Sequence, residues 1–310
     1  MYIYYLNKQN LDLSAAEVLA LAKKQKYELI DNCLLLDELV DYKRLAYTKK
    51  IYQLLFTTNK KNFLKDLKSF DFNTYYKKNF KLSLVNNVDY KIGELADIIW
   101  DSLKKPASKM KNAQTNFEII FSKKIFVCLQ VWENNEKFED RKAHLRPFNH
   151  PTSLHPRLAR CLVNLVNSKH VLDPFCGSAG ILIEAGLIGL NITGFDLDDI
   201  MLKRAKENLT EQKINNFQLI HQDALKIKKK YESIVTDLPY GKNSKVSDLE
   251  KTYSDFLKNS FSKTNKMVVV FPNSVNAKKL ISKSKWKVEN IFSYYIHKSM
   301  TKEIFLLENI

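Results

Sequence analysis

Residues 237–240, Asp-Leu-Pro-Tyr, place a carboxylate, a proline and an aromatic ring side by side; we call this segment the acidic turn. The exocyclic amine of a nucleobase is a poor nucleophile because its lone pair is delocalised into the ring. The Asp237 carboxylate and the Leu238 carbonyl can accept the two hydrogens of such an amine, which orients the nitrogen and stabilises developing charge. Pro239 restricts the backbone, and Tyr240 can stack on the base, worth roughly 1–3 kcal/mol. The alternative is an ordinary β-turn.

A second segment, residues 173–180 (Asp-Pro-Phe-Cys-Gly-Ser-Ala-Gly), has the composition of a nucleotide-cofactor loop, and we call it the glycine loop. Gly177 and Gly180 let a ligand approach the backbone, and the N–H groups of a following helix favour a carboxylate. Asp173 can accept a hydrogen bond from a ligand ammonium. The loop has neither the Gly-Lys-Ser/Thr of a P-loop nor the GxGxxG of a dinucleotide site. An amino acid moiety therefore suits it better than a pyrophosphate, and a plain strand–helix turn is the alternative.

Two further acids follow predicted strands. Asp196 comes about 20 residues after the glycine loop, where an acid typically holds a ribose diol. Asp198 and Asp199 fit better at the start of the next helix, where acids are favourable. Asp223 follows the third strand and could accept the amino group of an adenine. For each acid alone, a helix cap or a solvated loop position is the alternative.

The elements that must position these residues alternate between strands and helices. Such alternation predicts βαβ units with a parallel sheet. The last two strands read as a hairpin, so we expect the sheet to end with an antiparallel strand. The predicted strands cover residues 170–173, 192–196, 217–221, 233–237, 267–271, 286–296 and 301–308, and the helices 178–190, 199–212 and 248–262.

The N-terminal part reads as mixed α and β structure. Ser14 and Glu17 match a capping box at the start of a helix. Residues 44–57 fit either an amphipathic helix or a strand. Residues 117–121 and 125–132 predict a hairpin. The charged stretch 133–150, with Pro147 inside it and Pro151 just beyond, is the best domain boundary.

Net charge favours a polyanionic partner. The 310 residues carry 50 Lys and Arg against 34 acids, a formal net charge of +16. Residues 1–150 and 151–310 each contribute about +8, so the surplus is spread over the chain. Because only six of the basic residues are Arg, a Lys-rich solvated surface from an AT-biased genome is the alternative.

The cysteines and the apolar runs restrict the protein class. Four scattered Cys form no CxxC pair, which argues against a zinc site and for a reduced, cytoplasmic protein with buried thiols. No apolar run approaches the 18 residues of a membrane span, so no membrane association is expected.

These motifs, in this order, resemble Rossmann-like S-adenosylmethionine methyltransferases that methylate amino groups. Residues 146–160 (Arg-Pro-Phe-Asn-His-Pro-Thr-Ser-Leu-His-Pro-Arg-Leu-Ala-Arg) narrow the resemblance to THUMP-domain tRNA guanosine-N2 methyltransferases, most of all to archaeal enzymes that modify guanosine 10. The usual motif is Asp/Asn-Pro-Pro-Tyr/Phe, and this chain has Leu238 in place of its first proline. The accepting carbonyl survives that change, but the segment loses rigidity.

The resemblance implies a role for each motif residue. The acidic turn would be catalytic, and the remaining residues would bind S-adenosylmethionine. The implied catalytic residues are Asp237, Leu238, Pro239 and Tyr240, and the implied cofactor-binding residues are Asp173, Phe175, Gly177, Ser178, Gly180, Asp196, Leu197, Asp223 and Ala224.

The resemblance also implies a domain order: a ferredoxin-like unit (1–55), a THUMP domain that binds RNA (56–138), a linker (139–153) and a seven-stranded methyltransferase domain whose last strand is antiparallel (154–310). The expected partner is tRNA, and the expected state a monomer. Some relatives need a small activating protein, and the sequence leaves open whether this chain does. It also leaves open which guanosine is modified and whether one methyl or two are added. The alternatives are a methyltransferase for another tRNA or rRNA base and a non-catalytic RNA-binding protein.

Overall fold

A computed structural model describes residues 1–310 except 24–25, 87–88, 149–152, 241–245, 298–299 and 310. The chain forms two compact units. The first consists of Met1–Leu11, Ala22–Val40 and Thr48–Asn135, and the second of Asp12–Leu21, Asp41–Tyr47 and Glu136–Ile310. Two short N-terminal segments therefore belong to the second unit, where Leu13, Ala46 and Tyr47 join a hydrophobic core.

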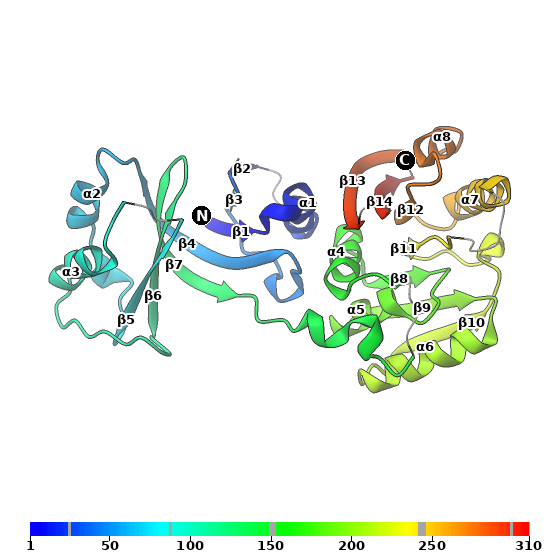
Figure 1. Cartoon of the computed structure of the whole chain (residues 1–310), viewed down its shortest axis with the longest axis horizontal. Helices are drawn as coiled ribbons and strands as arrows, with labels where there is room; N and C mark the ends of the chain where they lie inside the picture. The colour runs from blue at the N-terminus through cyan, green and yellow to red at the C-terminus, as the bar shows by residue number, and fades with distance from the viewer. Residues whose placement is uncertain (24–25, 87–88, 149–152, 241–245, 298–299, 310) are drawn as a thin grey trace. The chain divides into compact units, whose positions relative to one another are not determined.

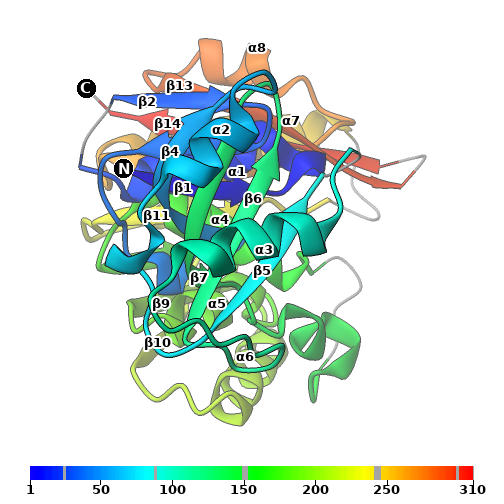
Figure 2. The same cartoon turned by 90° about the vertical axis from the view of Figure 1, so that its left-hand side faces the viewer.

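The first unit is built on one seven-stranded sheet with the order β2-β3-β1-β4-β7-β6-β5. Helices α2 and α3 lie across one face of its β5–β6 end (Figures 1 and 2). The strands are β1 (Tyr2–Leu6), β2 (Tyr27–Ile30), β3 (Cys33–Leu36), β4 (Thr48–Thr58), β5 (Phe80–Val85), β6 (Thr115–Phe121) and β7 (Ile125–Glu133), and the helices α2 (Phe63–Ser69) and α3 (Ile92–Ser102). The predicted boundary between residues 55 and 56 falls within β4, which pairs with β1 and β7.

Three N-terminal predictions have clear outcomes. The hairpin of β6 and β7 is confirmed, and the undecided stretch 44–57 is a strand from Thr48 onward, in β4, whereas Arg44 ends a short 3-10 helix. The capping box is wrong, because α1 (Leu11–Leu21) begins three residues before Ser14. The buried carboxylate of Glu17 instead accepts hydrogen bonds from the backbone N–H groups of Ala46 and Tyr47, at 2.8 and 2.9 Å, within the second unit.

The second unit contains the predicted Rossmann-like sheet, with strand order β10-β9-β8-β11-β12-β14-β13. All neighbouring strands from β10 to β12 are parallel, and β14 is antiparallel to both of its neighbours. The strands are β8 (His170–Asp173), β9 (Asn191–Asp196), β10 (Phe217–His221), β11 (Ser233–Asp237), β12 (Lys266–Pro272), β13 (Lys287–His297) and β14 (Met300–Glu308). The helices are α4 (Pro156–Val166), α5 (Gly180–Leu187), α6 (Asp199–Glu211), α7 (Val246–Phe261) and α8 (Ala277–Ser282).

The buried strand β12 shows why this sheet is covered on both faces. Val268 and Val270 enter the core shared with α4, α5 and α6, whereas Met267, Val269 and Phe271 enter the core shared with α7 and α8. Because successive side chains of a strand point to opposite faces, a continuous apolar run needs helices on both sides. The carboxyl ends of β8 to β11 then meet at one edge of the sheet (Figure 1).

Arg141, which belongs to the predicted linker, packs within the second unit. It lies against Phe138, the last residue of the predicted THUMP domain, which is fully buried in that same unit. The guanidinium groups of Arg141 and Arg157 lie 5.1 and 4.7 Å from the Phe138 ring centroid. The glycine loop and the acidic turn belong to the same unit as Phe138 and Arg141. Among the residues that the structure describes, no helix combines the length and apolar character needed to cross a bilayer.

Candidate functional site

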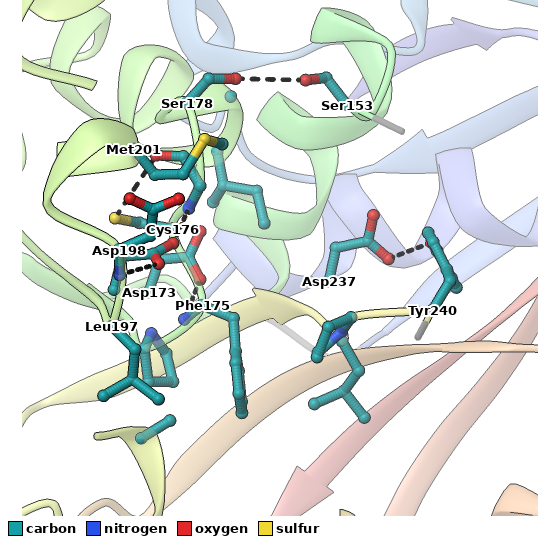
Figure 3. Close-up of a pocket in the computed structure, with 18 of the residues that line it drawn as sticks. Ser153, Asp173, Phe175, Cys176, Ser178, Leu197, Asp198, Met201, Asp237 and Tyr240 are labelled. Atoms are coloured by element: carbon teal, nitrogen blue, oxygen red, sulfur yellow. Dashed lines mark hydrogen bonds between the residues drawn. The ribbon is translucent and has the colours of Figure 1, made fainter. Parts of the chain in front are cut away.

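A cavity of about 680 Å³ opens where the carboxyl ends of β8, β9, β10 and β11 meet, and its size is typical of small-molecule sites. Every residue that the sequence predicts as catalytic or cofactor-binding lines this one cavity. In the view of Figure 3, the glycine loop gathers on one side of it and the Asp237–Tyr240 pair on the other. Ligands of open α/β sheets bind at this edge of the sheet.

Asp173 ends strand β8 and is 2% exposed. Its Oδ1 accepts hydrogen bonds from the Thr236 hydroxyl at 2.7 Å and the Phe175 N–H at 3.2 Å. Burial is the largest influence and raises the pKa of Asp173 to about 7, against the opposing effect of these two bonds. A buried carboxyl group with few donors around it suits a cationic ligand group.

The glycine loop crosses from β8 to α5 through two residues with left-handed backbone, Gly177 (φ 49°) and Ala179 (φ 68°). The Gly177 N–H donates to Asp196 Oδ2 at 3.0 Å, which ties the loop to the end of β9. Gly194 of the neighbouring strand β9 packs closely against this region. A Cβ added at Gly194 would lie 2.6 Å from Leu182 Cδ1 and 2.9 Å from Cys176 Sγ. The loop conformation therefore depends on glycine on both of these elements.

Three acids at or just beyond the carboxyl ends of β9 and β10 each accept a hydrogen bond from a backbone amide. Asp196 Oδ1 accepts the Asp198 N–H at 3.0 Å, Asp198 caps α6 through the Ile200 N–H, and Asp223 Oδ1 accepts the Leu225 N–H at 2.9 Å. All three acids also line the cavity. A carboxylate has about four acceptor positions, so a cap and a ligand contact are compatible. Asp198, expected only at a helix start, is a lining residue as well.

The acidic turn follows β11 and is held from several sides. The Tyr240 hydroxyl donates to Asp237 Oδ1 at 2.5 Å. The Tyr253 hydroxyl of α7 donates to the Pro239 carbonyl. Leu238 is fully buried, and its N–H donates to the Val270 carbonyl of β12 at 3.1 Å. A proline at position 238 has no N–H and could not donate this hydrogen bond. In this chain a hydrogen bond to the sheet therefore restrains the backbone at position 238, where the usual motif has a proline ring.

Lys302 is the residue of this site that the sequence did not indicate. It lies on β14, its side chain is 3% exposed, and its Nζ is 2.7 Å from Asp237 Oδ2. The same ammonium lies 4.8 Å from the centroid of the Tyr240 ring. The only signal in the sequence is a lysine in a strand that is otherwise largely apolar, and one strand position does not identify a partner 65 residues away.

Arg146, from the segment that narrowed the family resemblance, lies behind the glycine loop. A Cβ added at Gly180 would be 3.3 Å from its Nη1. Its Nε donates to the Arg141 carbonyl at 2.9 Å, whereas Nη1 and Nη2 are buried and have no hydrogen-bond partner among the described residues. Burial lowers the pKa of Arg146, yet a guanidinium stays protonated in proteins. An unpaired buried cation beside a helix N-terminus favours an anionic ligand group.

Sequence comparison places the second half of this chain among methyltransferase domains. The family model described as UPF0020 (RMKL-like, methyltransferase domain) matches residues 143–302. A tRNA (guanine(10)-N2)-dimethyltransferase of Methanothermobacter thermautotrophicus is 31% identical over 289 residues, which cover 86% of this chain and 84% of the relative. A protein of the same name from Pyrococcus abyssi is 32% identical over 64% of this chain and 63% of its own length.

Comparison of structures agrees on the fold. The crystal structure of TrmN from Thermus thermophilus aligns with a TM-score of 0.53 and 16% identity, and the alignment covers 100% of this chain and 99% of that one. At this identity the likeness shows the fold alone.

Proposed function

This chain belongs to the UPF0020 family of RMKL-like methyltransferase domains, and from this premise we propose that it methylates the exocyclic N2 amine of a guanosine in tRNA, with S-adenosylmethionine as the methyl donor. The observation that carries the proposal is the Asp237 carboxylate, at the end of β11 in the same cavity as the glycine loop. The names of the relatives from M. thermautotrophicus and P. abyssi support guanine N2 as the target.

The residues of the cavity fit the cofactor at each of its polar groups. Asp173, buried and with a raised pKa, would accept a hydrogen bond from the ammonium of the methionine moiety. The N–H groups at the start of α5 suit the carboxylate, and Arg146, which lies beside Gly180 and not in the cavity lining, has two unpaired nitrogens that would favour a negative charge there. Asp196 would hold the ribose hydroxyls and Asp223 the adenine amino group. The other predicted binding residues, Phe175, Gly177, Ser178, Gly180, Leu197 and Ala224, would shape the cavity around these groups.

The acidic turn would orient the guanine. Asp237 and the Leu238 carbonyl would accept the two hydrogens of the N2 amine, which directs the nitrogen lone pair toward the cofactor side of the cavity. When bound, S-adenosylmethionine would supply an electrophilic methyl group on a positively charged sulfur, with a neutral thioether as the leaving group. Asp237 Oδ stabilises the positive charge on the nitrogen and accepts the proton that the nitrogen loses. Pro239, held by Tyr253, would restrict the turn, and Tyr240 would stack on the base.

Finer properties belong to the same proposal. Guanosine 10 is the modified position suggested by the names of the relatives, with one or two methyl groups added. The first unit would comprise the ferredoxin-like and THUMP regions and bind the tRNA, for which a charge of about +8 in residues 1–150 is suitable. We also propose that the protein acts in the cytoplasm as a monomer.

A substrate that differs by one amine tests the proposal. Inosine is guanosine without the exocyclic N2 amine. We expect labelled cofactor to methylate an unmodified tRNA, and a transcript with inosine at every guanosine to accept no label. Label in the inosine transcript, in an rRNA fragment at a higher rate, or in DNA alone would favour another nucleobase target. Binding of tRNA without any transfer would favour a non-catalytic RNA-binding protein.

The role given to Arg146 has its own test with a matched ligand. Charge-assisted hydrogen bonds contribute about 1.5–3 kcal/mol, so Arg146→Gln should weaken S-adenosylmethionine binding by roughly 10- to 150-fold in calorimetry. Decarboxylated S-adenosylmethionine lacks the group that Arg146 would bind, and we expect it to bind the variant and the parent protein equally. Equal weakening for both ligands would assign Arg146 to folding of the loop and not to the carboxylate.

A further inference from the structure

Lys302 occupies an unusual position for a lysine. It lies in β14, directly opposite Pro272 of β12 and Tyr294 of β13, and its side chain is almost completely buried. A buried ammonium costs several kcal/mol unless it is paired and hydrogen-bonded. An apolar residue is usual at such a position, so the charge of Lys302 implies a specific role.

The contacts of Lys302 are directed at the acidic turn. Its Nζ donates to Asp237 Oδ2 at 2.7 Å and lies over the Tyr240 ring, while the Tyr240 hydroxyl donates to Asp237 Oδ1 at 2.5 Å. Each oxygen of the carboxylate thus has one partner from the protein. Since a carboxylate has about four acceptor positions, both oxygens can still accept a substrate hydrogen. Lys302 and Tyr240 hold the carboxylate in one orientation and leave acceptor positions free for the substrate.

We propose that Lys302 is a positioning residue for methyl transfer: its ammonium fixes the Asp237 carboxylate in orientation and keeps it ionised, ready to accept a hydrogen of the guanine amine. This inference rests on the proposed function for its substrate and goes beyond it in assigning a role to a residue outside the methyltransferase motifs. Lys302 acts through Asp237 and does not itself take part in the transfer of the methyl group or the proton.

The charges around Asp237 explain why a cation is needed there. Burial raises the pKa of Asp237, and the Lys302 ammonium and the Tyr240 hydroxyl oppose that rise. The other titratable groups that interact with it are Asp173 of β8 and Tyr253 of α7, and neither is a cation. Without Lys302, none of the described groups that interact with the Asp237 carboxyl would be a cation. The pKa of Asp237 would then rise further, which lowers the fraction of protein with the ionised carboxylate that accepts hydrogen bonds well.

The sign of the predicted pH effect follows from this arrangement. The active form needs ionised Asp237, so the rate falls as pH falls through the pKa of this group. Removal of Lys302 raises that pKa further, which moves the acid limb of the pH–rate profile to higher pH. The loss of rate in Lys302→Met should therefore be large at neutral pH and shrink as the pH rises. A purely structural role of Lys302 would lower the rate by the same factor at every pH.

The test compares three variants in single-turnover methylation of an unmodified tRNA transcript across the neutral pH range. We expect Lys302→Met to slow transfer at neutral pH by roughly tenfold to a hundredfold, the usual effect of a misplaced reacting group, with the acid limb displaced. Lys302→Arg keeps the charge and should recover most of the rate. Lys266→Met is the matched control. Lys266 also lies in this sheet and pairs with the carboxylates of Glu289 and Glu308 on neighbouring strands, but it does not contact the acidic turn. It should keep the parent profile.

A second readout does not depend on the substrate. In protein labelled with ¹³C at the aspartate side-chain carboxyls, with the Asp237 signal assigned from Asp237→Asn, Lys302→Met should move the Asp237 titration to higher pH. Calorimetry with S-adenosylmethionine verifies that each variant is folded, and Lys302→Gln replaces the methionine variant if that one does not fold. An unchanged Asp237 titration, or equal loss of rate at every pH in the methionine and arginine variants, would overturn the inference. A parent protein that methylates no tRNA guanosine would reject the proposed function, and the titration would still decide on Lys302.

Discussion

Leu238→Pro would restore the usual motif of the family, and the structure predicts that it destabilises this protein. The substitution removes the N–H that donates to the Val270 carbonyl at 3.1 Å and leaves that buried carbonyl without this donor, which costs about 1–3 kcal/mol. The proline ring also has one carbon fewer than the fully buried leucine side chain, a loss of about 0.8 kcal/mol. Reduced freedom of the unfolded chain offsets about 0.4–1 kcal/mol. The free energy of unfolding should fall by about 1–3 kcal/mol.

The assay is denaturant unfolding of the parent protein, Leu238→Pro and the control Leu238→Val. Valine has the same number of side-chain carbons as proline and keeps the N–H, so we expect it to lower the unfolding free energy by only about 1 kcal/mol. The difference between the two variants reports the Val270 bond. Both variants keep the position 238 carbonyl, and their folded fractions should methylate tRNA within a few-fold of the parent rate. A proline variant as stable as the valine variant would refute the view that this bond replaces the rigidity of the missing proline.

Two further perturbations test the cofactor side of the cavity. Because the pKa of Asp173 is raised to about 7, its carboxylate is available to a ligand ammonium above that pH and lost below it, so affinity for S-adenosylmethionine should fall as pH falls through 7. Calorimetry should show this step in the parent and not in Asp173→Asn, whereas the ammonium of the ligand titrates alike with both; the same step in both would exclude Asp173. Gly194→Ala places a methyl group within 3 Å of Leu182 Cδ1 and Cys176 Sγ and should lower the unfolding free energy by about 1–3 kcal/mol and weaken cofactor binding. A Cβ added at Gly93 on helix α3 would have no atom within 4 Å, so Gly93→Ala should change neither the unfolding free energy nor cofactor binding in this way. Equal effects of the two substitutions would contradict the close packing at β9.

The sequence could predict the catalytic sheet because its signals are local. Apolar runs such as 267–271 specify buried strands, and the acids that end strands 170–173, 192–196 and 233–237 mark the edge where a ligand binds. The local sequence of residues 44–57 did not distinguish a helix from a strand. Strand β4 lies between β1 and β7, and pairing with these two strands determines its conformation more than its own hydrophobic pattern does.

The remaining parts of the site depend on contacts between distant segments. Glu17 matches a capping box by spacing, yet its carboxylate binds Asn164 Nδ2 at 2.7 Å and the backbone near residue 46, neither of which a local pattern contains. Lys302 reaches Asp237 because β14 pairs with β12, and β12 in turn pairs with β11, which ends at Asp237. One lysine in a Lys-rich chain does not predict this pairing of strands. Arg146 was part of a motif, but its unpaired nitrogens appear only in the folded loop.

Mass spectrometry of nucleosides from tRNA, after incubation with the protein and S-adenosylmethionine, tests the central claim most directly. We expect N2-methylguanosine or N2,N2-dimethylguanosine with the parent protein, and neither product with Asp237→Ala, which should still bind the cofactor in calorimetry. That substitution removes both the charge and the acceptor oxygens, and loss of a residue that positions and deprotonates the amine typically costs about 10²–10⁴-fold in rate. Formation of N6-methyladenosine in place of a methylated guanosine, or full activity of Asp237→Ala, would contradict the account.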